Sequence, residues 1–293
     1  MVAADVELER LTPAARGVRF LSRTPVHIAL VAITIIWLIP SLGLAITSLR
    51  PRPDISSSGW WEVVTHPNFT LDNYRQVLES EGMQQAFVNS LFITLPSTLI
   101  PLTVGALAAF AFAWIRFPLR DTIFLAMVAL MVVPIQTSLI PLLKLFRSLG
   151  VTDSYVGIWL AHSAFGLPLA IFLLRNFFIT LPRDLIEAAR IDGASNVAVF
   201  RRIVVPLSVP ALASYGIFQF LWVWNDLLMA LIFVQNPNQR PMTLKINDLL
   251  STYGQEWHLL SSGAFLLMIV PLAVFFSLQR YFVQGLLAGS VKG

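Results

Sequence analysis

The sequence predicts an all-α membrane protein that crosses the bilayer six times. Hydrophobic residues make up 56% of the 293 residues, and charged residues make up only 12%. A typical soluble domain has about 25% charged residues, so this chain has too few charges to cover its apolar surface in water. Lipid is therefore the expected solvent. The long apolar stretches are continuous and do not alternate with polar residues, which favours helices over a membrane barrel.

Six apolar stretches bounded by charged residues are long enough to span a bilayer, which takes about 20 helical residues. The first lies between Arg23 and Arg50 and exceeds the apolar core of a signal peptide, so we expect a retained helix. The predicted spanning helices cover residues 26–49, 86–113, 122–144, 155–175, 208–234 and 262–283.

The distribution of basic residues predicts how the chain is oriented. With the N-terminus in the cytoplasm, thirteen of the 20 Lys and Arg residues lie in inside segments and seven in outside segments. Because short cytoplasmic loops carry an excess of Lys and Arg, we expect both termini in the cytoplasm. The chain then divides into a cytoplasmic N-terminal segment (1–25), a six-helix membrane domain (26–283) and a cytoplasmic C-terminal tail (284–293). These loops account for the net charge of +4, so no nucleic-acid partner is expected.

The segment 181–206, between the fourth and fifth apolar stretches, predicts two short helices on the cytoplasmic surface. Pro182 suits the first turn of a helix, and Gly193 can adopt the left-handed conformation that ends one. Ser195 is a good cap for a second helix, which Pro206 is expected to end. Leu185, Ala188 and Ala189 share one face of the first helix.

This segment contains a specific pattern: Glu-Ala-Ala, three residues, Gly, nine residues, and Ile-x-Leu-Pro. It resembles the permease subunits of binding-protein-dependent ATP-binding-cassette (ABC) importers, with Val205 in place of the usual Leu. The resemblance implies a coupling helix that docks in a groove of an ATPase subunit, where Glu187 and either Arg201 or Arg202 could pair with charges. The residues to which it assigns coupling are Glu187, Ala188, Ala189, Gly193, Arg201, Ile203 and Pro206.

Other short matches make the resemblance more specific. From about Phe69 onward the chain resembles the carbohydrate branch of these permeases, particularly the smaller six-helix subunit of maltose importers. The matching segments are Phe69–Tyr74, Asn89-Ser90, Pro134–Pro141, Trp224–Asp226 and Gly285–Gly293.

The resemblance implies a type I importer permease fold in a bacterial cytoplasmic membrane and a sugar or oligosaccharide as solute. It also implies a second permease subunit, two ATPase subunits that bind ATP and magnesium, and an extracytoplasmic solute-binding protein. Gly289–Gly293 would reach the ATPase.

Polar residues within the apolar stretches are candidates for a substrate path. Asp226 is the only acid deep in such a stretch, where a charge costs about 2.5–3.5 kcal/mol on insertion scales. Asn225 and Asp226 could bond a sugar hydroxyl, and Trp222 or Trp224 could stack on a sugar face. Alternatively, this cluster caps a kinked helix or bonds a neighbouring helix. The path candidates are Gln136, Ser138, Gln219, Trp222, Asn225 and Asp226.

The chain lacks the usual signatures of an enzyme. It has no Cys and no phosphate-binding, zinc-protease or hydrolase motif, so we expect neither catalysis nor a metal or cofactor in this chain. A stand-alone secondary transporter or channel is the main alternative, although it would be expected to show inverted repeats or an acidic relay. An intramembrane enzyme would have to use Asp226 and His162, which are a poor catalytic set.

Overall fold

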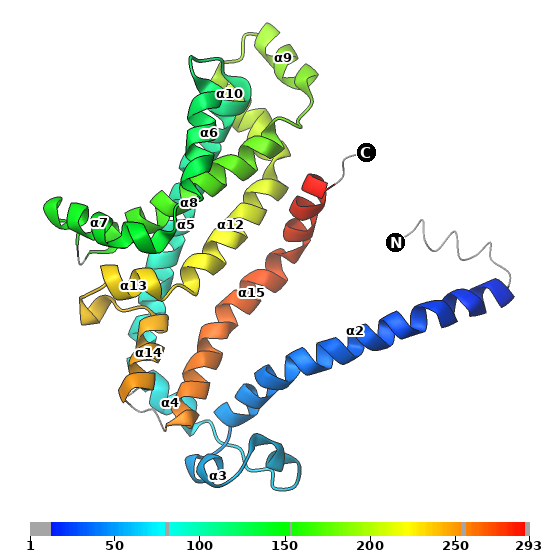
Figure 1. Cartoon of the computed structure of the whole chain (residues 1–293), viewed down its shortest axis with the longest axis vertical. Coiled ribbons are helices and arrows are strands. Elements are labelled where there is room, and N and C mark those ends of the chain that lie inside the picture. The colour runs from blue at the N-terminus through cyan, green and yellow to red at the C-terminus, as the bar shows by residue number, and fades with distance from the viewer. Residues whose placement is uncertain (1–12, 80–81, 153, 253–255, 291–293) are drawn as a thin grey trace.

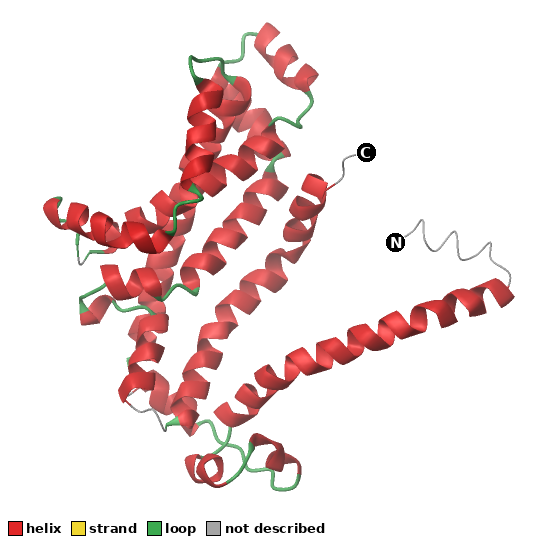
Figure 2. Cartoon of the chain, viewed as in Figure 1, coloured by secondary structure: helices red, strands yellow, loops and turns green. Residues whose placement is uncertain are grey.

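The structure, a computed structural model, describes residues 13–79, 82–152, 154–252 and 256–290 (Figure 1). These ranges contain helices and loops and no strand (Figure 2). The helices are α2 (Pro13–Ser48), α3 (Arg52–Ser57), the 3-10 helix η1 (Trp60–Val64), α4 (Asp72–Glu79), α5 (Met83–Trp114), α6 (Arg120–Leu130), α7 (Ile135–Ser148), α8 (Tyr155–Phe178), α9 (Arg183–Ile191), α10 (Asn196–Val199), the π-helix η2 (Phe200–Val204), α11 (Val205–Leu207), α12 (Val209–Trp224), α13 (Leu228–Phe233), the 3-10 helix η3 (Pro237–Gln239), α14 (Met242–Thr252) and α15 (Trp257–Ser290).

Four of the described helices are long and apolar enough to cross a membrane alone: α2, α5, α8 and α15. Two bent pairs raise the number of candidate spans to six if each pair counts as one span. Helices α6 and α7 meet at 102°, and the segment Asn196–Leu207 meets α12 at 77°. These counts rest on length and composition, and they agree with the predicted all-α protein of six spans.

The single helices predicted for 122–144 and 208–234 are both interrupted. Helix α6 ends at Leu130, and α7 begins after Pro134, whose backbone caps it in an extended conformation. Because proline disfavours helical geometry in the residue before it, the chain turns at this point. The second interruption lies between Trp224 and Leu228, where α12 gives way to α13.

The centre of the bundle is the pair α5 and α8, on which α12 and then α15 pack (Figure 1). Gly105 of α5 lies against Ala170 of α8, and a Cβ at Gly105 would be 2.6 Å from the Ala170 Cβ. The absence of a side chain at Gly105 therefore lets the two helices approach closely.

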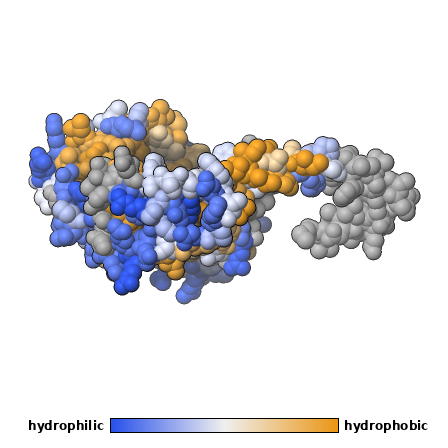
Figure 3. Space-filling model, turned by 90° about the horizontal axis from the view of Figure 1, so that it is seen from below, coloured by the Kyte–Doolittle hydropathy of each residue, from blue (hydrophilic) through white to orange (hydrophobic). Residues whose placement is uncertain are grey.

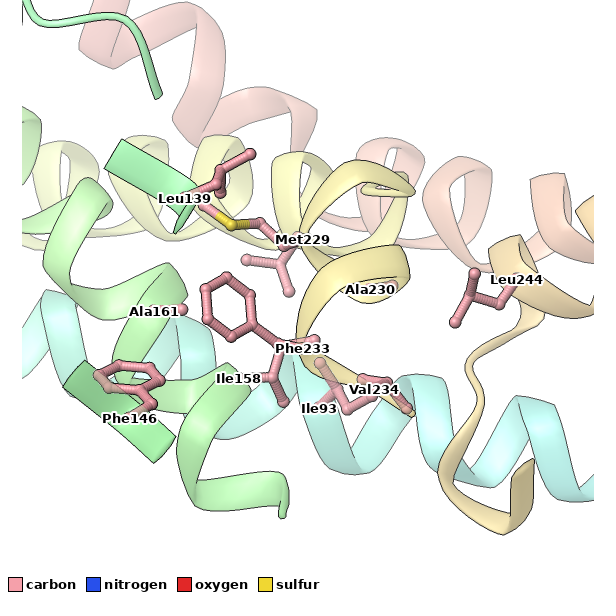
Figure 4. Packing of buried hydrophobic residues seen from close by; sticks show 11 residues of the cluster. Ile93, Leu139, Phe146, Ile158, Ala161, Met229, Ala230, Phe233, Val234 and Leu244 are labelled. Atoms are coloured by element: carbon pink, nitrogen blue, oxygen red, sulfur yellow. The ribbon is translucent and has the colours of Figure 1, made fainter. Parts of the chain in front are cut away.

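An apolar cluster ties the short helices α7 and α13 to this central pair (Figure 4). Phe233 of α13 is buried beside Phe146 of α7, with the ring centroids 5.6 Å apart. Ile158 and Ala161 of α8 belong to the same cluster. The interrupted segments are thus packed into the core.

Helix α2 differs from the other candidate spans because it stands apart from the bundle along most of its length (Figures 1 and 3). Only 6% of its most apolar window is buried, against 44% for α8. Exposed apolar side chains such as Ile36 and Trp37 cover it. An apolar helix with so little cover from its own chain must be covered by lipid or by another protein.

Other short helices lie at the two ends of the bundle. Helices α9 and α10 lie at the end we call the α9 end, and α3 and α4 lie at the opposite end, the α4 end (Figure 1). At the α4 end, Asn73 donates hydrogen bonds to the carbonyls of Ser48 (3.0 Å) and Arg50 (2.8 Å), and Ser262 donates to the Ser48 carbonyl at 3.2 Å. These bonds fasten the end of α2 to α4 and α15.

Candidate functional site

The segment 181–206 forms the predicted pair of short helices at the α9 end. Helix α9 begins directly after Pro182 and ends at Ile191. Gly193 has a φ of 82°, which confirms the predicted left-handed turn. The Ser195 hydroxyl accepts a hydrogen bond from the Ala198 N–H at 3.3 Å, which confirms the predicted cap of α10.

The second helix of the segment contains a π-turn before it reaches the bundle. The Val205 N–H donates to the Phe200 carbonyl, one residue further back than in an α-helix. Pro206 follows and has no N–H to donate, so the regular ladder cannot continue through it. The helix continues to Leu207, one residue beyond its predicted end. The chain then bends into α12.

One face of α9 is anchored in the bundle. Ile186 is fully buried and packs with Phe178 of α8 and with Val199 and Val204 of the second helix. The Arg190 guanidinium donates a 2.9 Å hydrogen bond to the Trp114 carbonyl near the end of α5. These contacts join α9 to the ends of α5 and α8. Ile186 was not among the predicted site residues, although its apolar character next to Leu185 was a usable signal.

The opposite face of the segment is exposed and partly apolar. The side chains of Leu185, Ile191 and Val197 are 49%, 86% and 65% exposed. Among the residues to which the resemblance assigns coupling, Ala189 and Ile203 are half-buried against the bundle. The others are exposed: Glu187, Ala188, Gly193, Arg201 and Pro206. The predicted face of Leu185, Ala188 and Ala189 is thus split, with Ala189 turned toward the core.

A cavity of about 420 Å³ lies between the α6–α7 bend, α8 and α12. Of the six candidates for the substrate path, Ser138, Gln219 and Trp222 line it, whereas Gln136, Asn225 and Asp226 are not among its lining residues. Phe165 of α8 and Phe218 of α12 also line it. These two were not predicted, because nothing in their sequence pattern distinguishes them from the other aromatic residues of the spanning helices.

Gln219 joins the cavity wall to three helices. Its side chain donates to the Ser97 carbonyl of α5 at 3.2 Å and accepts from the Tyr215 hydroxyl at 3.2 Å. Tyr215 also donates to the Gly166 carbonyl of α8 at 3.0 Å. A Cβ at Gly166 would be 2.7 Å from the Gln219 Nε2. The glutamine therefore fits only because residue 166 is glycine.

Asp226 lies at the interruption between α12 and α13. Its carboxylate accepts a hydrogen bond from the Ala230 N–H at 3.2 Å, and its carbonyl accepts one from the Thr243 hydroxyl at 2.8 Å. The His162 Nε2 is 3.8 Å from the same carboxylate. Asn225 donates to the Leu221 carbonyl at 2.8 Å. This geometry corresponds to the alternative in which the cluster caps a broken helix and bonds a neighbouring one.

The structure is an apolar helical bundle with a partly open cavity and an exposed helix pair at one end, an arrangement that suits a membrane permease subunit. Residues 101–287 match the family described as binding-protein-dependent transport system inner membrane component. The chain belongs to this family.

Two curated relatives match large parts of the chain. The osmoprotective compounds uptake permease protein GgtD of Synechocystis sp. is 52% identical over 100% of both chains. The alpha-glucoside transport system permease protein AglG of Rhizobium meliloti is 51% identical over 80% of this chain and 63% of its own length.

A solved structure shares the fold. A bacterial ABC transporter involved in the import of the acidic polysaccharide alginate contains a chain that matches with a TM-score of 0.66 at 14% identity. The match covers 95% of this chain and 100% of that chain.

The family determines the general role of the protein. It is a multi-pass inner-membrane permease component of a binding-protein-dependent transport system and not an enzyme. The predicted family, permease fold and transport role are confirmed. Transport by a stand-alone secondary transporter or channel and intramembrane catalysis are both set aside.

Proposed function

We propose that this chain and a second permease subunit form the path through which a sugar, an oligosaccharide or a sugar-like osmoprotectant enters the cell. The observation that carries this proposal is the cavity beside the α6–α7 bend. Its wall combines the aromatic rings of Phe165, Phe218 and Trp222 with the polar groups of Ser138 and Gln219. Sugars present apolar ring faces and hydroxyl groups, so such a wall suits them. The name of the relative AglG specifies an alpha-glucoside, and that of GgtD specifies osmoprotective compounds.

The second permease subunit would cover the surfaces that this chain leaves open. Helix α2 is the largest of these, because its exposed side is apolar along the length of a membrane span. A neighbouring helix bundle packed there would bury this side.

The exposed face of 181–206 is the proposed contact with an ATPase subunit. Leu185, Ala188 and Ile191 offer an apolar surface of small and medium side chains, and Glu187 and Arg201 offer charges beside it. Two ATPase subunits would bind ATP and magnesium. Each would contact this segment on one of the two permease subunits. The Ile186 anchor and the Arg190 bond would then transmit the movement to α5 and α8.

The proposed orientation places the α9 end and both termini in the cytoplasm of a bacterial cell. The α4 end, whose surface is largely hydrophilic (Figure 3), would face outward and receive the solute-binding protein. Most basic residues then lie inside, as expected for short cytoplasmic loops. The domain limits 1–25, 26–283 and 284–293 follow from this orientation. Gly289–Gly293 is a second proposed ATPase contact, of which residues 291–293 lie outside the described residues.

Transport would proceed by alternating access between two conformations with different ATPase contacts. The bends at α6–α7 and at 225–227 are where the path can change shape. Gln136, Asn225 and Asp226 lie at these bends, outside the cavity wall of this conformation, and we propose that they meet the solute in the other one.

The contact with the ATPase can be tested by co-purification with the ATPase subunits in detergent. Ala188→Trp adds bulk to the exposed face of α9 and is expected to reduce recovery of the ATPase. Ser56→Trp adds the same bulk to an exposed site on α3 at the opposite end and should leave recovery unchanged. Equal recovery with both variants would refute the contact.

The solute can be tested with the full assembly in vesicles that contain ATP. Labelled glucosides and osmoprotectants should be taken up, and amino acids should not. Uptake of amino acids alone would exclude the proposed solute class.

A further inference from the structure

The structure contains a second cavity, of about 450 Å³, at the α9 end. It lies where α5 and α8 end, where α6 begins, and beside α9. Five arginines from these elements and the intervening loop line it, and they define what we call the arginine cavity: Arg116, Arg120, Arg175, Arg183 and Arg190. The mechanism above uses only one of them, Arg190, as an anchor for α9.

The arginine cavity carries an excess of positive charge. Glu187 is the one carboxylate among its lining residues. A second carboxylate, Asp121, lies 3.2 Å from Arg120 and 3.7 Å from Arg175. Five guanidinium groups against two carboxylates leave an excess of three positive charges.

Several donors around the arginine cavity lack an acceptor. Arg116 and Arg183 are exposed, and neither forms an ion pair with any residue that the structure describes. The Arg175 Nε and the Trp114 indole N–H are buried, and no hydrogen-bond acceptor lies within reach in the described part of the chain. Unpaired buried donors are unfavourable, so an anion that engages them would stabilise this end of the bundle.

The chemistry of the arginine cavity fits a phosphate group. A guanidinium presents paired N–H donors that match phosphate oxygens in a bidentate arrangement. Arginines from four different parts of the fold surround one volume, so a single anion can contact several of them at once. The Arg175 guanidinium makes a cation–π contact with the Phe124 ring, whose centroid is 4.1 Å away.

The position of the arginine cavity favours a lipid as the source of that phosphate. Phe112 and Ile179, at the ends of the apolar helices α5 and α8, form part of its wall. Leu119, at the start of α6, is 71% exposed beside it. Arginines next to apolar side chains at the end of membrane spans match the boundary between headgroups and acyl chains.

We propose that the arginine cavity binds the phosphate of an anionic phospholipid and thereby positions α9 for contact with the ATPase. The assignment to the cytoplasmic leaflet rests on the orientation under the proposed function. Because Arg183 and Arg190 belong to α9, bound lipid would link the coupling segment directly to the membrane surface.

The test measures lipid retention by the full chain in complex with its partners. The complex is purified from membranes that contain phosphatidylcholine and phosphatidylglycerol, and the retained lipids are counted by native mass spectrometry. Arg116→Gln with Arg183→Gln is expected to lower the preference for phosphatidylglycerol about tenfold or more, because two arginine contacts are lost. The matched control, Lys144→Gln with Arg147→Gln, removes the same charge from exposed positions of α7 outside the cavity and should retain the preference.

Two further measurements identify the molecule that binds in the arginine cavity. Inorganic phosphate that displaces phosphatidylglycerol from the wild type, and not from the double variant, would support a site that recognises the phosphate group itself. Equal retention in both double variants would overturn the proposal. Loss of the ATPase subunits from the cavity variant with unchanged lipid retention would also overturn it, in favour of an acidic protein segment. Lipid retention requires no transport, so a failure of sugar uptake would refute the proposed function and leave this test intact.

Discussion

The side-chain amide of Asn89 donates a 2.8 Å hydrogen bond to the backbone carbonyl of Asn238, which is 149 residues further along the chain. It also donates to the Arg240 carbonyl at 3.0 Å, and its oxygen accepts from the Tyr155 hydroxyl at 2.9 Å. The neighbouring Ser90 accepts the Met242 N–H at 2.9 Å. The pair Asn89-Ser90 thus joins α5, α8 and the start of α14, which explains its place among the segments that resemble the family.

Asn89→Ala is therefore expected to lower stability by about 1–3 kcal/mol, because it removes three hydrogen bonds made by a buried side chain. The midpoint of thermal unfolding in detergent measures the loss. Asn68→Ala is the control, since Asn68 is exposed and bonds Asp54 at the surface. A midpoint that falls equally in both variants would contradict a special role for Asn89.

Gly193→Ala is expected to cost about 1–2 kcal/mol, because the residue at this turn has a positive φ. Open space surrounds the position, so the cost is conformational and not steric. Gly216→Ala is the control, because Gly216 lies inside α12 and an added Cβ would make an ordinary contact of 3.7 Å with Leu102. The midpoint of thermal unfolding should fall for Gly193→Ala and should stay unchanged or rise for Gly216→Ala.

Gly193→Pro should have a larger effect than Gly193→Ala on transport. Proline cannot adopt the positive φ and removes the hydrogen bond from the Gly193 N–H to the Arg190 carbonyl, which measures 3.1 Å. We expect membrane insertion to remain normal and uptake by the reconstituted assembly to be lost. Normal uptake with this variant would show that the turn between α9 and α10 does not matter for coupling.

Gly105→Ala should destabilise the α5–α8 pair by about 1–3 kcal/mol through overpacking. The clash is with the Cβ of Ala170, so Ala170→Gly in the same chain should restore much of the loss. A double-mutant cycle of unfolding free energies measures this coupling. Additive effects of the two changes would mean that the cost of Gly105→Ala does not arise from contact with Ala170.

Asp226→Asn separates the two roles considered for this residue. Asparagine keeps an oxygen that can accept the Ala230 N–H, so a capping role predicts normal folding and near-normal uptake, whereas Asp226→Ala should lower stability by about 1 kcal/mol. If the carboxylate meets the solute, Asp226→Asn should fold normally and lose uptake. Uptake rates and unfolding midpoints of both variants decide between the two roles.

The sequence was sufficient to predict α5, α8 and α15, because each is a continuous apolar stretch with charged residues at both ends. It was not sufficient for the 102° bend between α6 and α7. Pro134 lies at this bend, but hydropathy averaged over 122–144 is the same for a straight and a bent segment. The interruption after Trp224 depends on contacts of Asp226 with Ala230 and Thr243 that composition does not reveal.

The candidate sites were predictable to different degrees. The turn at Gly193 and the cap at Ser195 follow from local conformational preferences, so both were predicted correctly. The role of Gln219 depends on Ser97 and on the missing side chain of Gly166, which are far away in the chain. Only the assembled bundle shows such contacts.

The isolation of α2 has a consequence for how cells produce this protein. If the proposed second permease covers α2, a newly made subunit would expose an apolar helix to the bilayer until that partner is synthesised, and unpaired copies are expected to be degraded by quality-control proteases. Balanced synthesis of the two gene products would then set the abundance of the finished transporter.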